Sequence, residues 1–375
     1  EDINGTNVLV GDTLKYSMTW DLSDMAGTTL SSETSGREFS FSDDFDETKV
    51  DVDKDLITVL DGKGNDVTKQ FNVQFDDKKG SFKVTAKEAA KLISTFGGQK
   101  LNVVFYATPK SGLKNGTEID NTAQQVNAGN VYKTNMVKNY VYNLDPKKDV
   151  IENLGNPKSL DQQEVGFNHV VTYTLKSSIL PKNYKFDTDS WSMEDHLDKR
   201  DDFNNHWYVY ALTDINLGNG QKVTKNTDIS RYFDYNYNDK DSVVTVFATK
   251  AFKDILNNYN KDQQVQFQTL IEVNRQGYGV VKNTFIEYHN KAKQNSNTVE
   301  TVTYKPITPQ ASKVVTVGQE TIDGLTKVVN DSGKTVIQGD TVSYTLNGQR
   351  LEENHAMVDS LTYVDDFDKD VTFSG

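Results

Sequence analysis

Residues 71–95 read FNVQFDDKKGSFKVTAKEAAKLIST, and residues 233–257 read FDYNYNDKDSVVTVFATKAFKDILN. Each stretch alternates apolar and polar residues as a β-strand does, turns, and alternates again. Each then enters a short segment with apolar residues at helical spacing. These residues are Ala89, Leu92 and Ile93 in the first stretch and Phe252, Ile255 and Leu256 in the second. The same unit at two places predicts two homologous, mainly β domains, each with a short added helix.

The ends of the two repeats also match. An Asn-Thr pair at 121–122 precedes Asn135 by 14 residues, and an Asn-Thr pair at 283–284 precedes Asn297 by the same 14. Each downstream asparagine begins a final β-rich run. A spacing kept this strictly predicts equivalent hairpins at the ends of both domains.

The repeats divide the chain into a domain at 1–143, a second at 144–306 and the opening of a third at 307–375. The joints LDPKKD and KPITPQAS are short and contain proline. Such joints are semi-rigid, which predicts an elongated array of domains.

Composition excludes several classes of function. The formal net charge is −13, whereas a nucleic-acid-binding protein needs a basic face. No apolar run approaches the roughly 20 residues of a membrane-spanning helix, so no membrane insertion is expected within this segment. The chain has no cysteine, so it contains no disulfide bond, even if it is secreted.

An acidic residue recurs where a core residue is expected. Residues 39–43 read FSFSD, residues 191–195 read WSMED and residues 361–365 read LTYVD. Side chains two apart in a strand share a face, which predicts that Asp43, Asp195 and Asp365 point into the core. Burial makes a charged carboxylate costly, so these carboxyl groups are expected to stay protonated.

Lysine and asparagine are available as partners at the ends of the domains. Lys148 shares a face with Val150, and Lys313 with Val315; Asn135 and Asn297 each precede an apolar residue by two and are expected to point inward. A buried lysine amine becomes neutral and nucleophilic, and a protonated Asp can polarise a carboxamide. One interpretation is therefore a spontaneous Lys–Asn isopeptide bond, formed once with loss of ammonia and without enzymatic turnover. The other is a buried Lys–Asp ion pair capped by an Asn.

The sequence resembles the antigen I/II family of streptococcal-type cell-wall adhesins. Residues 3–22 (INGTNVLVGDTLKYSMTWDL), 39–47 (FSFSDDFDE) and 56–68 (LITVLDGKGNDVT) look like the second C-terminal domain of that family. DPKKDV from residue 145, VVTYTL from 170, VKNTFIEYHN from 281 and NSNTVETVTY from 295 look like the third. A further repeat begins at residue 307. The chain therefore resembles a longer, tandem-domain relative of this family.

The resemblance implies immunoglobulin-like β-sandwiches with Lys–Asn isopeptide bonds that an Asp promotes. Carried over, it implies that Lys148 joins Asn297 with Asp195 as the promoting acid. In the first domain it implies Asp43 and Asn135, with the lysine before residue 1. In the third domain it implies Lys313 and Asp365, with the asparagine beyond residue 375 and Lys327 as a weaker candidate for the lysine. His196 departs from the family's DDFD motif, where the second residue is acidic.

The family also implies an extracellular protein, covalently anchored to a Gram-positive cell wall through a segment outside this one. Its expected role is that of an adhesin stalk, with host-surface or salivary-type glycoproteins or other bacteria as partners of the whole adhesin. The alternative is that these domains themselves bind a host glycoprotein or another microbe. No cofactor is expected; calcium near the loop at 44–46 is a weaker alternative, since the alternating acids at 51, 53 and 55 lack the glycine of an EF-hand.

Overall fold

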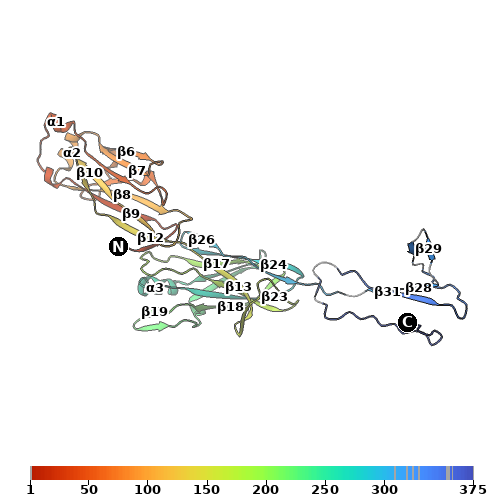
Figure 1. Ribbon diagram of the computed structural model, residues 1–375. Coiled ribbons are helices and arrows are strands. Elements are labelled where there is room, and N and C mark those ends of the chain that lie inside the picture. Colours follow the sequence, from red (N-terminus) through yellow and green to blue (C-terminus); the bar gives the residue numbers. More distant parts are fainter. Residues whose placement is uncertain are drawn as a thin grey trace.

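The structure is a computed structural model that describes residues 2–307, 310–317, 320–322, 325–327, 330–351, 355–356 and 358–374, without the side chains of 320–322 and 325–327. Three parts follow one another along the chain, from the red N-terminal part to the blue C-terminal part (Figure 1). The first two are built mainly of β-sheets, as the alternating sequence predicts. The added helix of each domain is present as well.

The first domain contains β-sheets packed around one core. Its elements are β1 (Asn7–Leu9), β2 (Leu14–Asp21), η1 (Ser23–Met25), α1 (Ser32–Ser35), β3 (Ser40–Asp44), β4 (Val50–Val52), η2 (Lys54–Leu56), β5 (Thr58–Leu60), η3 (Thr68–Gln70), β6 (Phe71–Asp76), β7 (Ser81–Ala86), α2 (Ala89–Phe96), β8 (Lys100–Pro109), β9 (Thr117–Asn121), β10 (Ala123–Asn127), β11 (Asn130–Lys133) and β12 (Val137–Tyr142). One sheet has the order β2-β8-β4, with β5 also on β8; the facing sheet has the order β11-β10-β3-β7-β6, and β1-β12-β9 form a third.

The second domain repeats this plan with two more strands at one edge of a sheet. Its elements are β13 (Lys147–Asn153), β14 (Asn156–Ser159), β15 (Gln163–Glu164), β16 (Val170–Lys176), β17 (Trp191–His196), β18 (Asp201–Ala211), β19 (Ile215–Gly218), β20 (Gln221–Val223), η4 (Ser230–Tyr232), β21 (Phe233–Asn238), β22 (Val243–Ala248), α3 (Lys250–Tyr259), β23 (Phe267–Arg275), β24 (Gly279–Asn283), β25 (Phe285–His289), β26 (Ala292–Asn295) and β27 (Val299–Thr303). Sheet β14-β13-β16-β23-β18 faces sheet β21-β22-β17-β25-β26, with β15-β27-β24 beside them.

Apolar alternation sets which face of each strand is buried. Phe41 on β3 and Met193 on β17 are fully buried, and Asp43 and Asp195, two residues later, are only 2% and 0% exposed. The inward direction predicted for these two acids is therefore confirmed. Helices α2 and α3 each cover one end of a core through an apolar face, with Leu92 and Phe252 buried.

The first two domains share a tight joint. Leu9 belongs to the core of the second domain, and β1 continues into it, since Asn7 N donates to Asn183 O at 3.0 Å. Tyr184 donates its hydroxyl to Asp12 at 3.1 Å, and burial raises the pKa of Asp12 to about 6. These contacts join the first two domains, which lie at an angle to each other (Figure 1).

The third part is a set of short pairs, β28 (Ser312–Val317) with β31 (Val342–Asn347) and β29 (Glu320–Ile322) with β30 (Leu325–Lys327). The inward orientation expected for the strand at 361–365 is wrong here. Leu361 and Tyr363 are 61% and 47% exposed, because no second sheet among the described residues covers them.

Candidate functional site

Lys148 lies at the centre of the second domain. It is the second residue of β13, opposite Leu175 of β16, and its side chain is fully buried. Its Nζ lies 4.5 Å from the ring centre of Tyr173 and 5.5 Å from that of Phe285. The amine donates to Asp195 Oδ2 at 2.5 Å. The structure thus brings together the lysine and the acid that the sequence analysis paired.

Burial changes the ionisation of both partners. Asp195 lies on β17 between β22 and β25, with its side chain fully buried. Desolvation raises the pKa of Asp195, and the neighbouring Lys148 amine opposes that rise. Desolvation also lowers the pKa of Lys148, against the opposing charge of Asp195. Both shifts favour a neutral amine beside a protonated carboxyl, in which the lysine is a nucleophile.

Asn283 completes this group. It ends β24, and after Thr284 the chain enters β25, whose first residue Phe285 pairs with Asp195. Asn283 is 3% exposed, and its carboxamide lies near enough to Asp195 to lower the pKa of that carboxyl. Yet neither atom of the carboxamide, nor Asp195 Oδ1, has a hydrogen-bond partner in the described part of the chain. The contact is close without being a well-formed hydrogen bond, although buried polar groups are normally paired.

Asn297 does not occupy the predicted place. It is exposed, and its carboxamide pairs with the backbone of Lys148, accepting from the Lys148 N–H at 2.8 Å and donating to the Lys148 carbonyl at 2.9 Å. The predicted inward direction is wrong because β27 begins only at Val299, so strand alternation does not extend back to Asn297. Its observed contact fixes the strand that carries the lysine.

The first domain has the same acid and carboxamide. Asn121 Nδ2 donates to Asp43 Oδ2 at 2.8 Å, and both residues are buried. Desolvation raises the pKa of Asp43 to about 7, opposed by the hydrogen bond from Asn121. Asn135, expected to point into the core, is exposed instead, because β12 begins only at Val137.

The third part contains the lysine and the acid. Lys313 on β28 donates to Asp365 at 2.6 Å, and its Nζ lies 4.2 Å from the ring centre of Tyr344. Here the two side chains are 41% and 17% exposed, so the pair is open to water. The side chain of Lys327, the weaker candidate, lies outside the described residues.

The second domain contains another buried polar network, which was not predicted from the sequence. Arg275, at the end of β23, is fully buried and donates through Nε to Asp201 at 2.6 Å. The same arginine donates to the hydroxyls of Thr301 and Thr303, and Tyr173 donates to Asp201 at 2.6 Å. A single arginine at a strand end carries no repeated signal, so sequence periodicity could not single it out.

The acidic loops of the first domain do not form a metal centre in the described structure. No group of three or more His, Cys, Asp or Glu side chains there is placed to hold a metal ion. Asp53 instead caps η2 by accepting from the Asp55 N–H, and Asp46 pairs with Lys49 at 2.9 Å. Calcium at the loop 44–46 stays a prediction.

Comparison with known proteins assigns both domains to one protein family. A family described as "Cell surface antigen I/II C2 terminal domain" matches residues 1–141, and "Cell surface antigen C-terminus" matches residues 145–304. The chain belongs to the antigen I/II family. It is therefore a cell-surface protein of the adhesin type, as the resemblance implied.

Relatives of known structure agree with this assignment. The C-terminal domains of Streptococcus agalactiae BspA and Streptococcus pyogenes AspA, both antigen I/II proteins, share its fold at 24% identity. Their TM-scores are 0.69 and 0.70, and each match covers 80% of this chain and 96% or 95% of the solved chain. The immunoglobulin-like fold class is thereby confirmed.

A curated relative is the "Aggregation substance" of Enterococcus faecalis, 38% identical over 84% of this chain. The chain spans only 24% of that protein's length. In the described residues, no helix is long and apolar enough to cross a membrane.

Proposed function

We propose that this segment is a covalently reinforced part of an adhesin stalk, in which Lys148 and Asn283 become joined by an isopeptide bond. The support is the buried group of amine, carboxyl and carboxamide, whose only unpartnered polar atoms are those the reaction would use. Asn283 takes the role that the sequence analysis gave to Asn297.

The reaction follows from the ionisation of the group. The neutral Lys148 amine attacks the side-chain carbonyl carbon of Asn283, while the protonated Asp195 donates to the carbonyl oxygen. The new C–N bond forms, the bond to Nδ2 breaks, and ammonia leaves with a proton that Asp195 relays. Exclusion of water by Tyr173 and Phe285 protects the intermediate from hydrolysis.

A bond between β13 and β24 joins the beginning and the end of the domain. By the loop-entropy relation used for disulfides, a cross-link closing about 135 residues stabilises the fold by roughly 5 kcal/mol. Under a pulling force, the strands between the two residues no longer carry the load. The stalk would hold an adhesive region away from the cell wall, for contact with host glycoproteins or, as the name of the enterococcal relative suggests, other bacterial cells.

Intact mass spectrometry tests the bond. We expect the mass of the purified chain to be lower than the mass calculated from its sequence by one ammonia. Tandem mass spectra should show a cross-link between the peptides that contain Lys148 and Asn283. Lys148→Ala, Asp195→Ala and Asn283→Ala should each restore the full mass. Asn297→Ala is the matched control and should still lose ammonia. A full mass for the unaltered chain would refute the proposal.

Direct receptor binding by these domains is a separate candidate, and no single contact among the described residues favours it over the stalk role. Deleting this segment from the whole adhesin separates the two. Loss of adhesion that a spacer of equal length restores supports the stalk, whereas loss that the spacer does not restore supports a receptor-binding role.

A further inference from the structure

The proposed bond leaves the last part of the second domain outside the covalent ring. This ring closes between Lys148 on β13 and Asn283 at the end of β24, whereas β25, β26 and β27 come later in the chain. We call residues 284–303 the outer segment. It is joined covalently to the ring at Asn283 alone. A force that pulls on Tyr304 from the next domain therefore reaches the outer segment before it reaches the bond.

The outer segment is part of the packed fold. Strand β25 pairs with β17 on one side and with β26 on the other. Its residues Phe285 and Glu287 are both 0% exposed. The carboxyl group of Glu287 accepts hydrogen bonds from Ser178 N at 3.0 Å and from Trp191 Nε1 at 2.7 Å. Because these buried groups would lose their partners, the segment leaves the sandwich only when work is done on it.

Strand β27 is held by a buried arginine that belongs to the ring. Arg275, at the end of β23, donates through Nη1 to Thr303 Oγ1 at 2.9 Å and through Nη2 to Thr301 Oγ1 at 2.8 Å. Asp201 accepts from Nε of the same guanidinium at 2.6 Å. The two threonines are buried. Hydrogen bonds from a charged donor are stronger than neutral ones, so these contacts tie β27 to the ring without a covalent bond.

Asn297 ties the other end of the same strand. Its carboxamide accepts from the Lys148 N–H at 2.8 Å and donates to the Lys148 carbonyl at 2.9 Å, two residues before β27 begins. Between these two ties, β27 pairs along its length with β24. All of these contacts resist the removal of the strand, and all of them are non-covalent.

The sandwich itself does not require the arginine. The Val-Gly pairs at 10–11 and 165–166 align β2 with β16, and through their partner strands they place Ala107 of β8 at the position of Arg275. Ala107 is buried as well. A buried ion pair can often be replaced by apolar residues without loss of stability. The arginine contact is therefore a feature of the second domain rather than of the fold.

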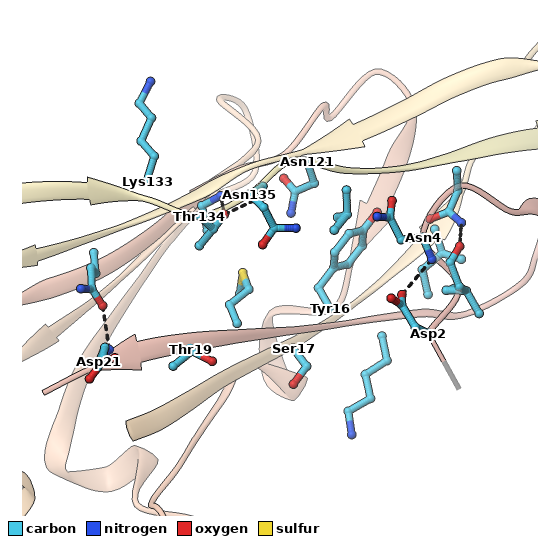
Figure 2. Close-up of a pocket in the computed structure, with 18 of the residues that line it drawn as sticks. Asp2, Asn4, Tyr16, Ser17, Thr19, Asp21, Asn121, Lys133, Thr134 and Asn135 are labelled. Carbon is cyan, nitrogen blue, oxygen red and sulfur yellow. Dashed lines mark hydrogen bonds between the residues drawn. The ribbon is translucent and has the colours of Figure 1, made fainter. Parts of the chain in front are cut away.

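Asn135, the counterpart of Asn297 by spacing, has different surroundings. It lines an open groove of about 540 Å³ together with Tyr16 and Asn121 (Figure 2). Its Nδ2 makes a 3.4 Å contact to the carbonyl of its neighbour Met136, whereas Asn297 bonds the backbone of β13 on both sides. The described structure thus shows the asparagine tie in the second domain.

We propose that the outer segment is an extensible element. Under tension, β27 and then the β25–β26 hairpin leave the sandwich while the covalent ring stays folded. The contacts of Arg275 with Thr301 and Thr303 set the force at which this begins. This inference rests on the proposed function, because the ring exists only if the bond between Lys148 and Asn283 does.

The length of the extension and its reversibility follow from the topology. About 20 residues at about 3.3 Å each add roughly 65 Å, against roughly 450 Å for the residues inside the ring. Strand β24, Arg275 and Asp201 lie inside the ring and stay in place. The outer segment can therefore return to them when the force falls. Each extension dissipates work, and the fold of the domain is kept.

Force spectroscopy on the full chain tests the proposal. The sequence has no cysteine, so Lys147→Cys and Lys305→Cys provide two unique attachment points on either side of the second domain. Both positions are exposed. Held at constant force between these points in magnetic tweezers, the chain should show a reversible step of roughly 65 Å.

Variants of the ties test what sets the force. Thr301→Val with Thr303→Val keeps the branched shape of both side chains but removes both acceptors of Arg275. At the same force this variant should extend about tenfold sooner, because two hydrogen bonds from a charged donor are lost. Thr303→Val alone should give an intermediate waiting time. Lys282→Ala is the matched control, since its ion pair with Glu300 of β27 is exposed, and its waiting time should stay within about threefold of the parent.

Intact mass, measured on the same samples, separates this inference from the proposed function. An unaltered chain that has lost one ammonia but shows no step of this length refutes the extensible element and leaves the bond standing. A step of roughly 20 Å would mean that the ring closes at Asn297, which also overturns the inference. A chain of full mass that extends by roughly 500 Å refutes the bond and the inference together. Equal waiting times for the two-threonine variant and the parent would show that Arg275 does not set the force.

Discussion

Within the described part of the chain, the buried carboxyl group of Asp43 has no cationic partner, and its effect on stability should be measurable in a pH titration. Its pKa is raised to about 7 by desolvation, against an ordinary value of 3.8. Between those two values the folded chain holds a proton that the unfolded chain has lost, so stability falls as pH rises. Below pH 4 the contribution is complete, and above pH 7 it is gone.

We expect the first domain to melt at a lower temperature at pH 8 than at pH 5, by an amount that Asp43→Asn largely removes. Between these two pH values the shift corresponds to at most about 3 kcal/mol. Scanning calorimetry across pH measures it. Asp12→Asn is the comparison variant, because burial raises the pKa of Asp12 to about 6, so this substitution should remove a smaller part of the pH dependence with the same sign. Equal pH dependence in the parent chain and Asp43→Asn would refute the assignment.

At the scale of strands, apolar–polar alternation correctly predicted that Lys148, Asp195 and Asp43 point into the core. It wrongly predicted the same for Asn297 and Asn135. The first three lie inside strands that continue on both sides, so a period of two decides which face they take. The two asparagines precede the first residue of β27 and β12, where the backbone is no longer pleated. Asn283 and Asn121 were visible as the repeated Asn-Thr pair. Their proximity to the acid depends on the crossing from β24 to β25 in the second domain and from β9 to β10 in the first, which no sequence period encodes.

The network at the end of β23 gives a stability prediction. Arg275→Ala leaves Asp201 buried without its cation and should destabilise the second domain by about 3–5 kcal/mol in chemical unfolding. Lys282→Ala is the surface control, since its ion pair with Glu300 is exposed and should contribute no more than about 1 kcal/mol. Similar losses of unfolding free energy in both variants would mean that burial does not determine how much these ion pairs stabilise the fold.

For the whole molecule, the proposed bond decides how the array responds to tension. With Lys148 joined to Asn283, residues between them are shielded when the chain is pulled from its ends. Lys148→Ala should release roughly 450 Å of additional extension at about 3.3 Å per residue, read by single-molecule force spectroscopy. Asn297→Ala should leave the extension short. If the unaltered chain also showed the additional extension, no bond between Lys148 and Asn283 would be carrying the force.

The division into β-rich repeats was predictable because each repeat carries its own strand, turn and helix signals. The joint between the first two domains was only partly so. The Pro-bearing link at 144–149 indicated stiffness, but the insertion of Leu9 into the second core and the contact of Asp12 with Tyr184 depend on three-dimensional placement. No sheet covers the strand pairs among the described residues of the third part, so the apolar alternation there does not give a buried strand.

The three groups of the proposed bond come from the first strand of the second domain, an early strand and a late one. A chain emerging from a ribosome or a secretion channel possesses the amine long before it possesses the carboxamide. The proposed ring closure therefore cannot precede the arrival of residue 283, and until then the chain stays accessible to chaperones and proteases. Once shut, the loop would record, irreversibly, that this portion of the polypeptide had reached its native arrangement.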